Sequence, residues 1–312
     1  DFLSLCPLRY ALCPVKGRRK ESFQAKYMGE PTLTINWTST QARRLKELDA
    51  ADAELDRRFE TDSEREKTFQ KLEKQFVAEH RRRLKEFREK HLRPALCKLE
   101  SKLVDVMVKQ GFAQVCTPIM MSRGLLAKMS IDANHPLNSQ IYWLDKNKCL
   151  RPMLAPHLYY VLVDLLRLWD KPVRIFEVGP CFRKESKGAQ HSSEFTMLNL
   201  VEMGLPEEIR EERIKELGAL VAEAAGVSNY QFDTVTSEVY GDTIDIVAGA
   251  DHLEIGSSAM GPHPLDRPWK ITDTWIGIGF GLERLLMVAE NTRNLAKMGR
   301  SITYLDGIRL NI

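Results

Sequence analysis

Cysteine is scarce in this sequence and is not arranged as a metal site or a disulfide framework requires. The chain of 312 residues has 6 cysteines, and the nearest pair, Cys6 and Cys13, has no second pair at a zinc-like interval. Zinc sites and disulfide-stapled domains need regularly spaced cysteines. We therefore expect reduced thiols, a cytoplasmic location and no structural metal.

Long apolar runs are also missing. No stretch reaches the about 18 apolar residues of a membrane-spanning helix, so we expect no membrane partner. Asp1 to Leu12 is mildly apolar, but it has no basic leader and no clear cleavage site, so we expect no signal peptide. The net charge is only +3 and does not by itself require a nucleic-acid partner. A hydrophobic content of 43% permits one large domain or two smaller ones.

Charge is concentrated in the part of the chain before residue 93. Residues 1–40 contain the basic run Lys16–Lys20 and little periodicity, which indicates a tail or a loosely attached arm. Residues 41–92 combine charge with apolar residues at helical intervals, which predicts two or more amphipathic helices, one of them capped by Thr61–Ser63. The basic cluster Arg81–Arg93 suits an RNA backbone, and a solvated helix face is the alternative.

The stretch from Val173 to Glu202 carries the most information about function. Two apolar runs flank the polar segment Lys187–Ser193, a pattern that predicts a β-hairpin with a long loop. Because side chains alternate between the faces of a strand, Arg183 and Glu185 would share one face of the first strand. The second strand would place four side chains on one face: Phe195, Met197, Asn199 and Val201.

Two interpretations of this hairpin remain open. If the two faces adjoin, a planar base could lie on Phe195 and Met197 while Arg183 binds a phosphate. Alternatively, the hairpin covers a core and carries an ordinary surface pair of arginine and glutamate, since exposed ion pairs are common and weak.

The stretch from Trp275 to Arg284 alternates glycine with large apolar residues. Its glycine face would be flat enough for a ligand to approach the backbone, although close packing on a neighbouring strand also explains the pattern. Leu282 to Val288 then predicts a helix, with Arg284 in its first turn. A helix N-terminus beside an arginine suits an anion.

Together, the two stretches resemble signature motifs of the class II aminoacyl-tRNA synthetases. Segments Phe182–Glu185 and Glu194–Phe195, with His191 between them, resemble the second motif, and Gly277–Arg284 resembles the third. Within that class, four segments resemble the pyrrolysyl-tRNA synthetases: Arg151–Pro156, Glu194–Asn199, Val239–Thr243 and Tyr304–Gly307. The resemblance runs from about residue 93 to residue 312 and is closest to the bacterial form, whose catalytic domain is a separate polypeptide.

The resemblance implies an α+β fold for residues 93–312, with an antiparallel β-sheet flanked by helices and preceded by an N-terminal helical extension. A helix over Pro94–Gln110, ended by Gly111, and a strand over Phe112–Pro118 resemble the first motif, which implies a homodimer. An ordinary helix–strand unit is the alternative. Further along we expect the following elements: a turn at Asp145–Lys148, a helix after Pro156, one long helix or a helix pair over Leu205–Gly226, and strands over Tyr240–Ile246 and Leu253–Met260.

The implied activity is that of a ligase, which activates L-pyrrolysine with ATP and Mg²⁺ and transfers it to the amber-suppressor tRNA-Pyl. A separate small tRNA-binding protein would assist in trans, because the family's RNA-binding domain has no recognisable counterpart in residues 1–40. Arg183 would hold the α-phosphate and Arg284 the γ-phosphate of ATP, stabilising charge as it develops. The implied ATP contacts are Arg183, Glu185, His191, Ser192, Phe195, Met197, Glu254, Ile255, Ser257 and Arg284.

Glu254 and Ser257 would also hold the magnesium ion, which prefers oxygen ligands. The two residues have opposite parity, so an ideal strand would put them on opposite faces. A β-bulge at Gly256 would bring them together. The segment Ala248–His252 is about two residues longer than the family pattern, which affects the preceding turn.

The implied amino-acid pocket is apolar with one polar anchor. Asn199 would bind the side-chain amide of an acylated lysine, and Tyr240 would reach its far end. Such a pocket discriminates shape weakly, so we expect it to accept other bulky N-acyl lysines. His157 stands where the family has asparagine. The implied pocket residues are Ala155, Leu158, Tyr159, Leu162, Asn199, Val201, Tyr240, Trp275 and Gly277.

Two other classes of protein also fit parts of the pattern. A non-catalytic relative could act as a regulatory or RNA-binding subunit, but the presence of Arg183, Glu185, Glu254 and Arg284 argues against it. A ligase for another acid, such as a phenylalanine-type synthetase, is the second alternative, and Asn199 with Tyr240 favours pyrrolysine. ATP–pyrophosphate exchange with a set of amino acids separates all three.

Overall fold

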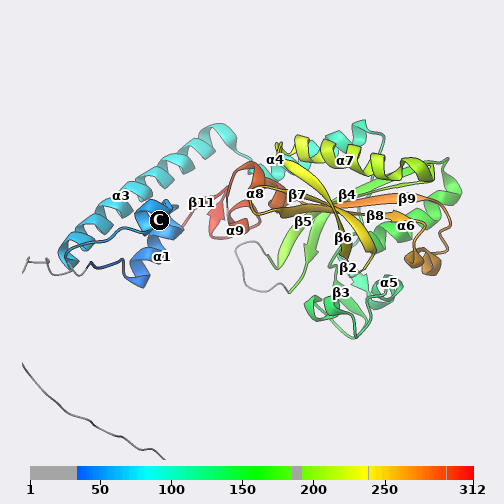
Figure 1. The fold of residues 1–312 in the computed structure, drawn as a ribbon, viewed down its shortest axis with the longest axis horizontal. Coiled ribbons are helices and arrows are strands. Elements are labelled where there is room, and N and C mark those ends of the chain that lie inside the picture. The colour runs from blue at the N-terminus through cyan, green and yellow to red at the C-terminus, as the bar shows by residue number, and fades with distance from the viewer. Residues whose placement is uncertain (1–33, 185–191, 238, 293) are drawn as a thin grey trace, which may run out of the picture.

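The structure, a computed structural model, describes residues 34–184, 192–237, 239–292 and 294–312. It has two visible parts, a helical arm at one end and a larger body built around a β-sheet (Figure 1). Most of the expected tail over residues 1–40 lies outside the described residues, as do Glu185 and His191. Among the helices that are described, none is both long and apolar enough to cross a membrane.

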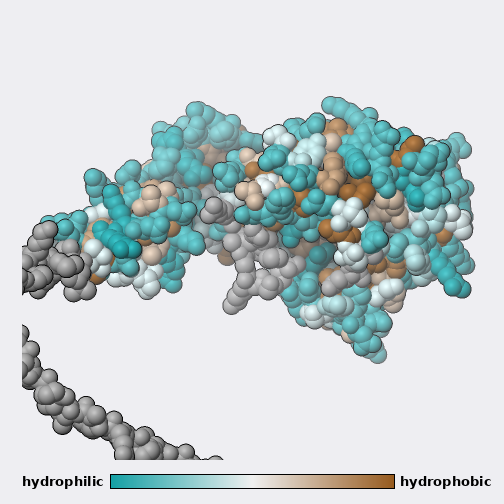
Figure 2. Space-filling model, in the orientation of Figure 1, coloured by the Kyte–Doolittle hydropathy of each residue, from teal (hydrophilic) through white to brown (hydrophobic). Residues whose placement is uncertain are grey.

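The arm confirms the expected amphipathic helices. Thr61 begins the longest of them, because its side chain accepts a hydrogen bond from the Glu64 backbone N–H. The helices pack around a small core of Trp37, Leu45 and Phe59, and the face seen in Figure 2 is mostly hydrophilic. The arm consists of α1 (Ser39–Glu47), α2 (Asp52–Leu55), α3 (Asp62–Glu86) and a π-helical turn (Phe87–His91).

The body is organised by a seven-stranded sheet with the order β1-β4-β5-β9-β8-β7-β6. All neighbouring strands in it are antiparallel except the β1–β4 pair, which is parallel. This arrangement confirms the expected α+β fold. The strands are β1 (Ala113–Gln114), β4 (Val173–Phe182), β5 (Glu194–Met203), β6 (Tyr230–Ser237), β7 (Gly241–Ala248), β8 (Leu253–Gly261) and β9 (Trp275–Gly281).

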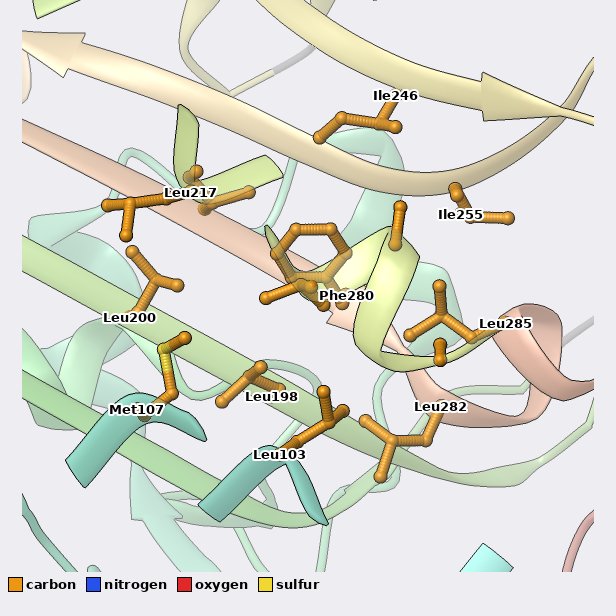
Figure 3. Close-up of a cluster of buried hydrophobic side chains, with 14 of the residues drawn as sticks. Leu103, Met107, Leu198, Leu200, Leu217, Ile246, Ile255, Phe280, Leu282 and Leu285 are labelled. Atoms are coloured by element: carbon orange, nitrogen blue, oxygen red, sulfur yellow. The ribbon is translucent and has the colours of Figure 1, made fainter. Parts of the chain in front are cut away.

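One face of the sheet is covered by three helices, α4 (Ala95–Lys109), α7 (Arg210–Ala224) and α8 (Leu282–Ala289). Figure 3 shows the core between them, in which Phe280 lies among leucine and isoleucine side chains from both layers. Alternate residues of β9, namely Ile276, Ile278 and Phe280, enter this core. The strand therefore turns Trp275 and its glycines to the opposite face.

The opposite face carries a second hydrophobic cluster and smaller elements. Helix α6 (Ala155–Leu168) contributes Leu158 and Leu162 to this cluster, and its N-cap residue Leu154 joins them. The remaining helices are short: α5 (Arg123–Lys128), α9 (Leu295–Met298) and the 3₁₀ helices η2 (Pro136–Gln140), η3 (Glu207–Ile209) and η4 (Pro264–Trp269). Two small antiparallel sheets complete the body, β2 (Met120–Ser122) with β3 (Lys148–Leu150), and the hairpin of β10 (Tyr304–Leu305) with β11 (Ile308–Arg309).

One expectation for an individual element needs correction, and one strand was missed. The predicted strand Phe112–Pro118 is only two residues long, because β1 pairs with β4 at Ala113 and Gln114, and the chain then turns so that Thr117 bonds to the Glu177 side chain. The edge strand β6 was not predicted. The helix expected over Pro94–Gln110 is confirmed as α4, and Gly111 follows it with a φ of 80°.

Candidate active site

A cavity of about 450 Å³ opens on one face of the sheet. This face is opposite the one that packs against α4, α7 and α8 in the core of Figure 3. The lining of the cavity brings together most of the residues predicted from the sequence. Fifteen of them line it: Ala155, Tyr159, Arg183, Ser192, Phe195, Met197, Asn199, Val201, Tyr240, Glu254, Ile255, Ser257, Trp275, Gly277 and Arg284.

Leu158 and Leu162 do not line this cavity. Both are fully buried in the cluster behind its wall. Ala155 and Tyr159 are four residues apart and share the helix face toward the cavity, whereas Leu158 and Leu162 share the neighbouring face. Glu185 and His191 lie outside the described residues, so their predicted ATP contacts stay predictions.

Strand alternation builds the floor of the cavity from β5 and β9. Phe195, Met197, Asn199 and Val201 all point into it, as predicted. In the antiparallel register, three of the β9 glycines lie opposite large β5 side chains: Met197 opposite Gly281, Asn199 opposite Gly279, and Val201 opposite Gly277. A Cβ atom at residue 279 would come within 3.2 Å of the Met197 methyl carbon. Because these glycines have no side chains, a ligand can approach the backbone of β9 closely.

The expected bulge is present in β8. Ile246 pairs with Gly256 and Val247 pairs with Glu254, which leaves Ile255 as the extra residue. The extra residue thus lies one position before the glycine named from the sequence. Because of it, Glu254 and Ser257 both reach the cavity despite their opposite parity.

The two arginines of the lining are held differently. Arg183 donates from Nε to the Pro152 carbonyl oxygen at 2.9 Å, and its guanidinium carbon lies 5.4 Å from the centre of the Phe195 ring. Arg284 donates to the Glu254 backbone oxygen at 3.1 Å and lies 3.6 Å from the Glu254 carboxylate. Both cations line a cavity wall where a polyphosphate could bind them.

The oxygen atoms near the bulge fit a hard cation. Glu254 is half exposed, and the Ser257 hydroxyl donates to Asp245 at 2.5 Å. Within the described residues, no group of three or more histidine, cysteine or acidic side chains could enclose a metal ion. A site with few protein oxygens suits Mg²⁺, which usually keeps water and binds substrate phosphates as well.

Aromatic rings and one carboxamide form the other end of the cavity. Tyr159 and Trp275 meet edge to face with ring centres 5.6 Å apart, and Tyr240 lies 6.4 Å from Trp275. Asn199 is 8% exposed, and its Nδ2 donates to the Ile278 carbonyl at 3.0 Å. Burial raises the pKa of both Tyr159 and Tyr240, so both phenols stay neutral.

Comparisons with known proteins agree with this geometry. The family model for the tRNA synthetases class II core domain (F) matches residues 83–306. Two solved structures of pyrrolysyl-tRNA synthetase from Desulfitobacterium hafniense are similar. One is 52% identical, with a TM-score of 0.83, and the match covers 89% of this chain and 99% of that chain. The other, PylSc, is 50% identical, with a TM-score of 0.82, and the match covers 92% and 100%.

The chain belongs to the pyrrolysyl-tRNA synthetase family of class II aminoacyl-tRNA synthetases. More distant relatives include the lysine–tRNA ligases of Listeria monocytogenes, 34% identical over 96 residues, and Moorella thermoacetica, 33% identical over 129 residues. The matched segments span 30% and 40% of this chain but only 17% and 24% of those ligases.

The cavity of the synthetase is also lined by residues for which no role was predicted from the sequence. They include Met153, Ser258, Ala259 and Glu283. Glu283 is 1% exposed, and both of its carboxylate oxygens accept from the Thr196 backbone N–H at 2.9 Å. Burial raises the pKa of Glu283. The only signal in the sequence was its place beside Arg284 in the third motif, which does not reveal a partner on β5.

Proposed function

We propose that this class II ligase activates L-pyrrolysine with ATP and transfers the aminoacyl group to tRNA-Pyl. The supporting observation is its identity of 50–52% to pyrrolysyl-tRNA synthetase structures over nearly the whole length of those chains. The cavity agrees with that substrate, since it joins a cationic end to an aromatic end that holds one carboxamide.

In this proposal, ATP binds at the end with the two arginines. Phe195 and Met197 form the platform for the adenine ring, and the glycines of β9 let the nucleotide lie close to the sheet. Arg183 binds the α-phosphate and Arg284 the γ-phosphate. Attack by the amino-acid carboxylate concentrates negative charge on the α-phosphate, and fixed cations in the cavity wall stabilise that charge. Ser192, Ile255 and, outside the described residues, Glu185 and His191 complete the predicted nucleotide contacts.

Glu254 and Ser257 are the residues that would hold Mg²⁺. When bound, the ion neutralises phosphate charge and orients the pyrophosphate leaving group. The 3.6 Å pair between Arg284 and Glu254 keeps these two groups side by side before any ligand arrives.

Pyrrolysine would occupy the aromatic end. Asn199 donates from Nδ2 to the Ile278 carbonyl oxygen at 3.0 Å and, over a longer 3.4 Å, to the Leu200 carbonyl oxygen. The amide carbonyl of the substrate would take over the longer of these two hydrogen bonds. Ala155, Tyr159, Val201, Tyr240, Trp275 and Gly277 would surround the aliphatic chain and the ring. Leu158 and Leu162 support this wall from behind.

Lysine is the second candidate substrate, because the curated relatives are lysine–tRNA ligases. Among the described residues that line the cavity, the carboxylates are Glu254 and Glu283. Glu254 lies beside Arg284, and Glu283 accepts from Thr196 near the start of β5, so neither lies at the aromatic end. A lysine ammonium at the aromatic end would find no carboxylate among the lining residues there to pair with, and burying an unpaired charge is costly.

ATP–pyrophosphate exchange tests the proposal. The purified protein should catalyse exchange with pyrrolysine and not with lysine or phenylalanine. Exchange with none of the three would favour the non-catalytic alternative, and efficient exchange with lysine or phenylalanine would replace the substrate.

The predicted partners form part of the same proposal. A homodimer is supported by exposed apolar side chains in and just after the helix–strand unit, namely Val108 of α4 and, beyond Pro118, Ile119 and Met120. Light scattering at micromolar concentration should give twice the mass of the chain.

The basic residues of α3 and the turn that follows would contact tRNA, with a separate small tRNA-binding protein acting in trans. Aminoacylation assays with and without that protein test this role, and cell fractionation tests the expected cytoplasmic location.

A further inference from the structure

Asp266 is a buried carboxylate that no motif in the sequence singled out. It lies in η4, is 4% exposed, and accepts hydrogen bonds from three neutral donors. Its Oδ2 accepts from the Trp275 indole N–H at 2.9 Å and from the His263 backbone N–H at 2.6 Å. Its Oδ1 accepts from the Tyr159 hydroxyl at 3.5 Å. None of the ion pairs found among the described residues includes it.

Each of these donors leads to the aromatic end of the cavity. Trp275 and Tyr159 line it directly. His263 leads to the third ring, because its Nε2 lies 2.7 Å from the Tyr240 carbonyl oxygen. The other ring nitrogen, Nδ1, accepts from the Leu265 N–H, so Nε2 carries the proton and donates to Tyr240. A single carboxylate thus connects aromatic residues from α6, from β9 and from the turn before β7.

The backbone of β8 is adapted to this arrangement. Gly261 pairs with Trp275 across the sheet, and a Cβ atom at residue 261 would collide with the indole nitrogen of Trp275. Only glycine at this position lets the indole lie across β8 with its N–H directed at Asp266.

Aromatic packing depends on the same orientation. Tyr159 stacks on Trp269, the last residue of η4, with ring centres 5.4 Å apart and an angle of 20° between the rings. Its edge-to-face contact with Trp275 has an angle of 85°. If the indole N–H lost its acceptor, a buried donor would be left unsatisfied, and the ring could tilt out of this geometry to find another partner.

We propose that Asp266 is a positioning residue that sets the shape of the aromatic end of the cavity, and with it the selectivity for the size of the amino-acid side chain. This inference rests on the function proposed above. Asp266 itself touches no substrate atom; it acts through Trp275, Tyr159 and Tyr240. The ATP end, which depends on Arg183 and Arg284, is independent of it.

The test compares two substitutions by ATP–pyrophosphate exchange. In Asp266→Ala we expect the KM for pyrrolysine to rise about tenfold or more, because buried donors lose their acceptor, while the KM for ATP stays within about twofold. Selectivity, the ratio of kcat/KM for pyrrolysine to that for a lysine with only an N-acetyl group, should fall as well. Asp266→Asn should retain most of the wild-type behaviour, because its amide oxygen can accept from Trp275 and His263 while its NH₂ group faces the Tyr159 oxygen.

Glu202→Gln is the matched control for general destabilisation. Glu202 is a carboxylate on β5 of similar burial, bonded to Arg174 and Arg213, and it points away from the cavity. Its substitution should leave both KM values unchanged. If Asp266→Ala fails to fold, Trp275→Phe removes the indole donor, together with part of the ring that lines the cavity, and should show the same loss of selectivity.

Three results would overturn the inference. Folded Asp266→Ala, or Trp275→Phe in its place, could show unchanged pyrrolysine kinetics. Asp266→Ala could raise both KM values equally, or Asp266→Asn could be as impaired as Asp266→Ala. Absence of pyrrolysine exchange in the wild-type protein would instead refute the proposed function, and the role of Asp266 would fall with it.

Discussion

Asn199 contributes a single neutral carboxamide to an end of the cavity that is otherwise aromatic and aliphatic. A carboxamide can bind an amide but cannot balance an ammonium. We expect Asn199→Ala to weaken pyrrolysine activation about ten- to a hundredfold, which corresponds to about 1–3 kcal/mol for a lost buried hydrogen bond. Exchange kinetics with pyrrolysine and lysine measure the effect. Wild-type kinetics in the variant would remove Asn199 from substrate recognition.

Arg183 and Arg284 are the two cations whose loss should abolish adenylate formation. Arg183 donates to the Pro152 carbonyl oxygen and Arg284 to the Glu254 carbonyl oxygen, and both side chains are partly exposed at the cavity wall rather than part of the core. Arg183→Ala and Arg284→Ala should therefore keep the fold, as judged by circular dichroism, while exchange falls to background. Near-normal exchange in either folded variant would contradict the assignment of phosphate binding to that arginine.

Strand β4 holds Arg183 in place through a buried ion pair. Glu177 and Arg151 meet at 2.7 Å, and both side chains are 2% exposed. Gly179 leaves the space for Arg151, since a Cβ there would collide with its guanidinium group. Arg151 accepts from the Phe182 N–H through its backbone oxygen, which sets the next carbonyl, that of Pro152, to receive Arg183.

Glu177→Gln should therefore impair both stability and catalysis. Removing one partner of a buried ion pair costs about 3–5 kcal/mol, and the shifted Pro152 carbonyl should lower kcat for exchange at saturating substrate. Glu202→Gln, which disturbs an ion pair next along the same hairpin, should lower the thermal unfolding temperature without lowering kcat. Equal kcat values in the two variants would show that the Glu177 pair has no role in positioning Arg183.

Patterns along the strands were enough to predict most of the residues on the floor of the site. Patterns along the helices and the short segments predicted fewer of the site residues. Alternation along β5 and β9 depends only on strand geometry, so Phe195 to Val201 and the glycines fell on the correct face. Periodicity along α6 could not separate Leu158 from Tyr159, because core and cavity walls are both apolar. The role of Asp266 could not be predicted from the sequence for another reason. Its hydrogen-bond donors are brought together by the tertiary fold, so no spacing of residues along the chain indicates them.

At the scale of the whole molecule, the helical arm and the sheet-bearing body meet through the C-terminal hairpin (Figure 1). His80 of α3 is 2% exposed at this junction. Its Nδ1 accepts from the Arg309 backbone N–H of β11 at 3.1 Å, and its Nε2 lies 3.3 Å from the Leu48 carbonyl oxygen. The ring can satisfy both only when it is neutral, with its proton on Nε2.

This junction should weaken in acid. Burial lowers the pKa of His80 in the folded protein, although Asp49 nearby opposes the shift, whereas the unfolded value is about 6.5. The unfolded chain then binds more protons as the pH falls below about 6.5, so the stability contributed by neutral His80 is complete above that pH and is lost toward the lower folded pKa.

His80→Gln can make the same two hydrogen bonds without titrating. Between pH 7.5 and pH 5.5, about one pH unit on either side of 6.5, the thermal unfolding temperature should drop further in the wild type than in this variant. Burial also lowers the pKa of His157. The unfolding temperature of both proteins should therefore keep a smaller, shared dependence on pH. Parallel pH profiles would show that His80 does not control the junction.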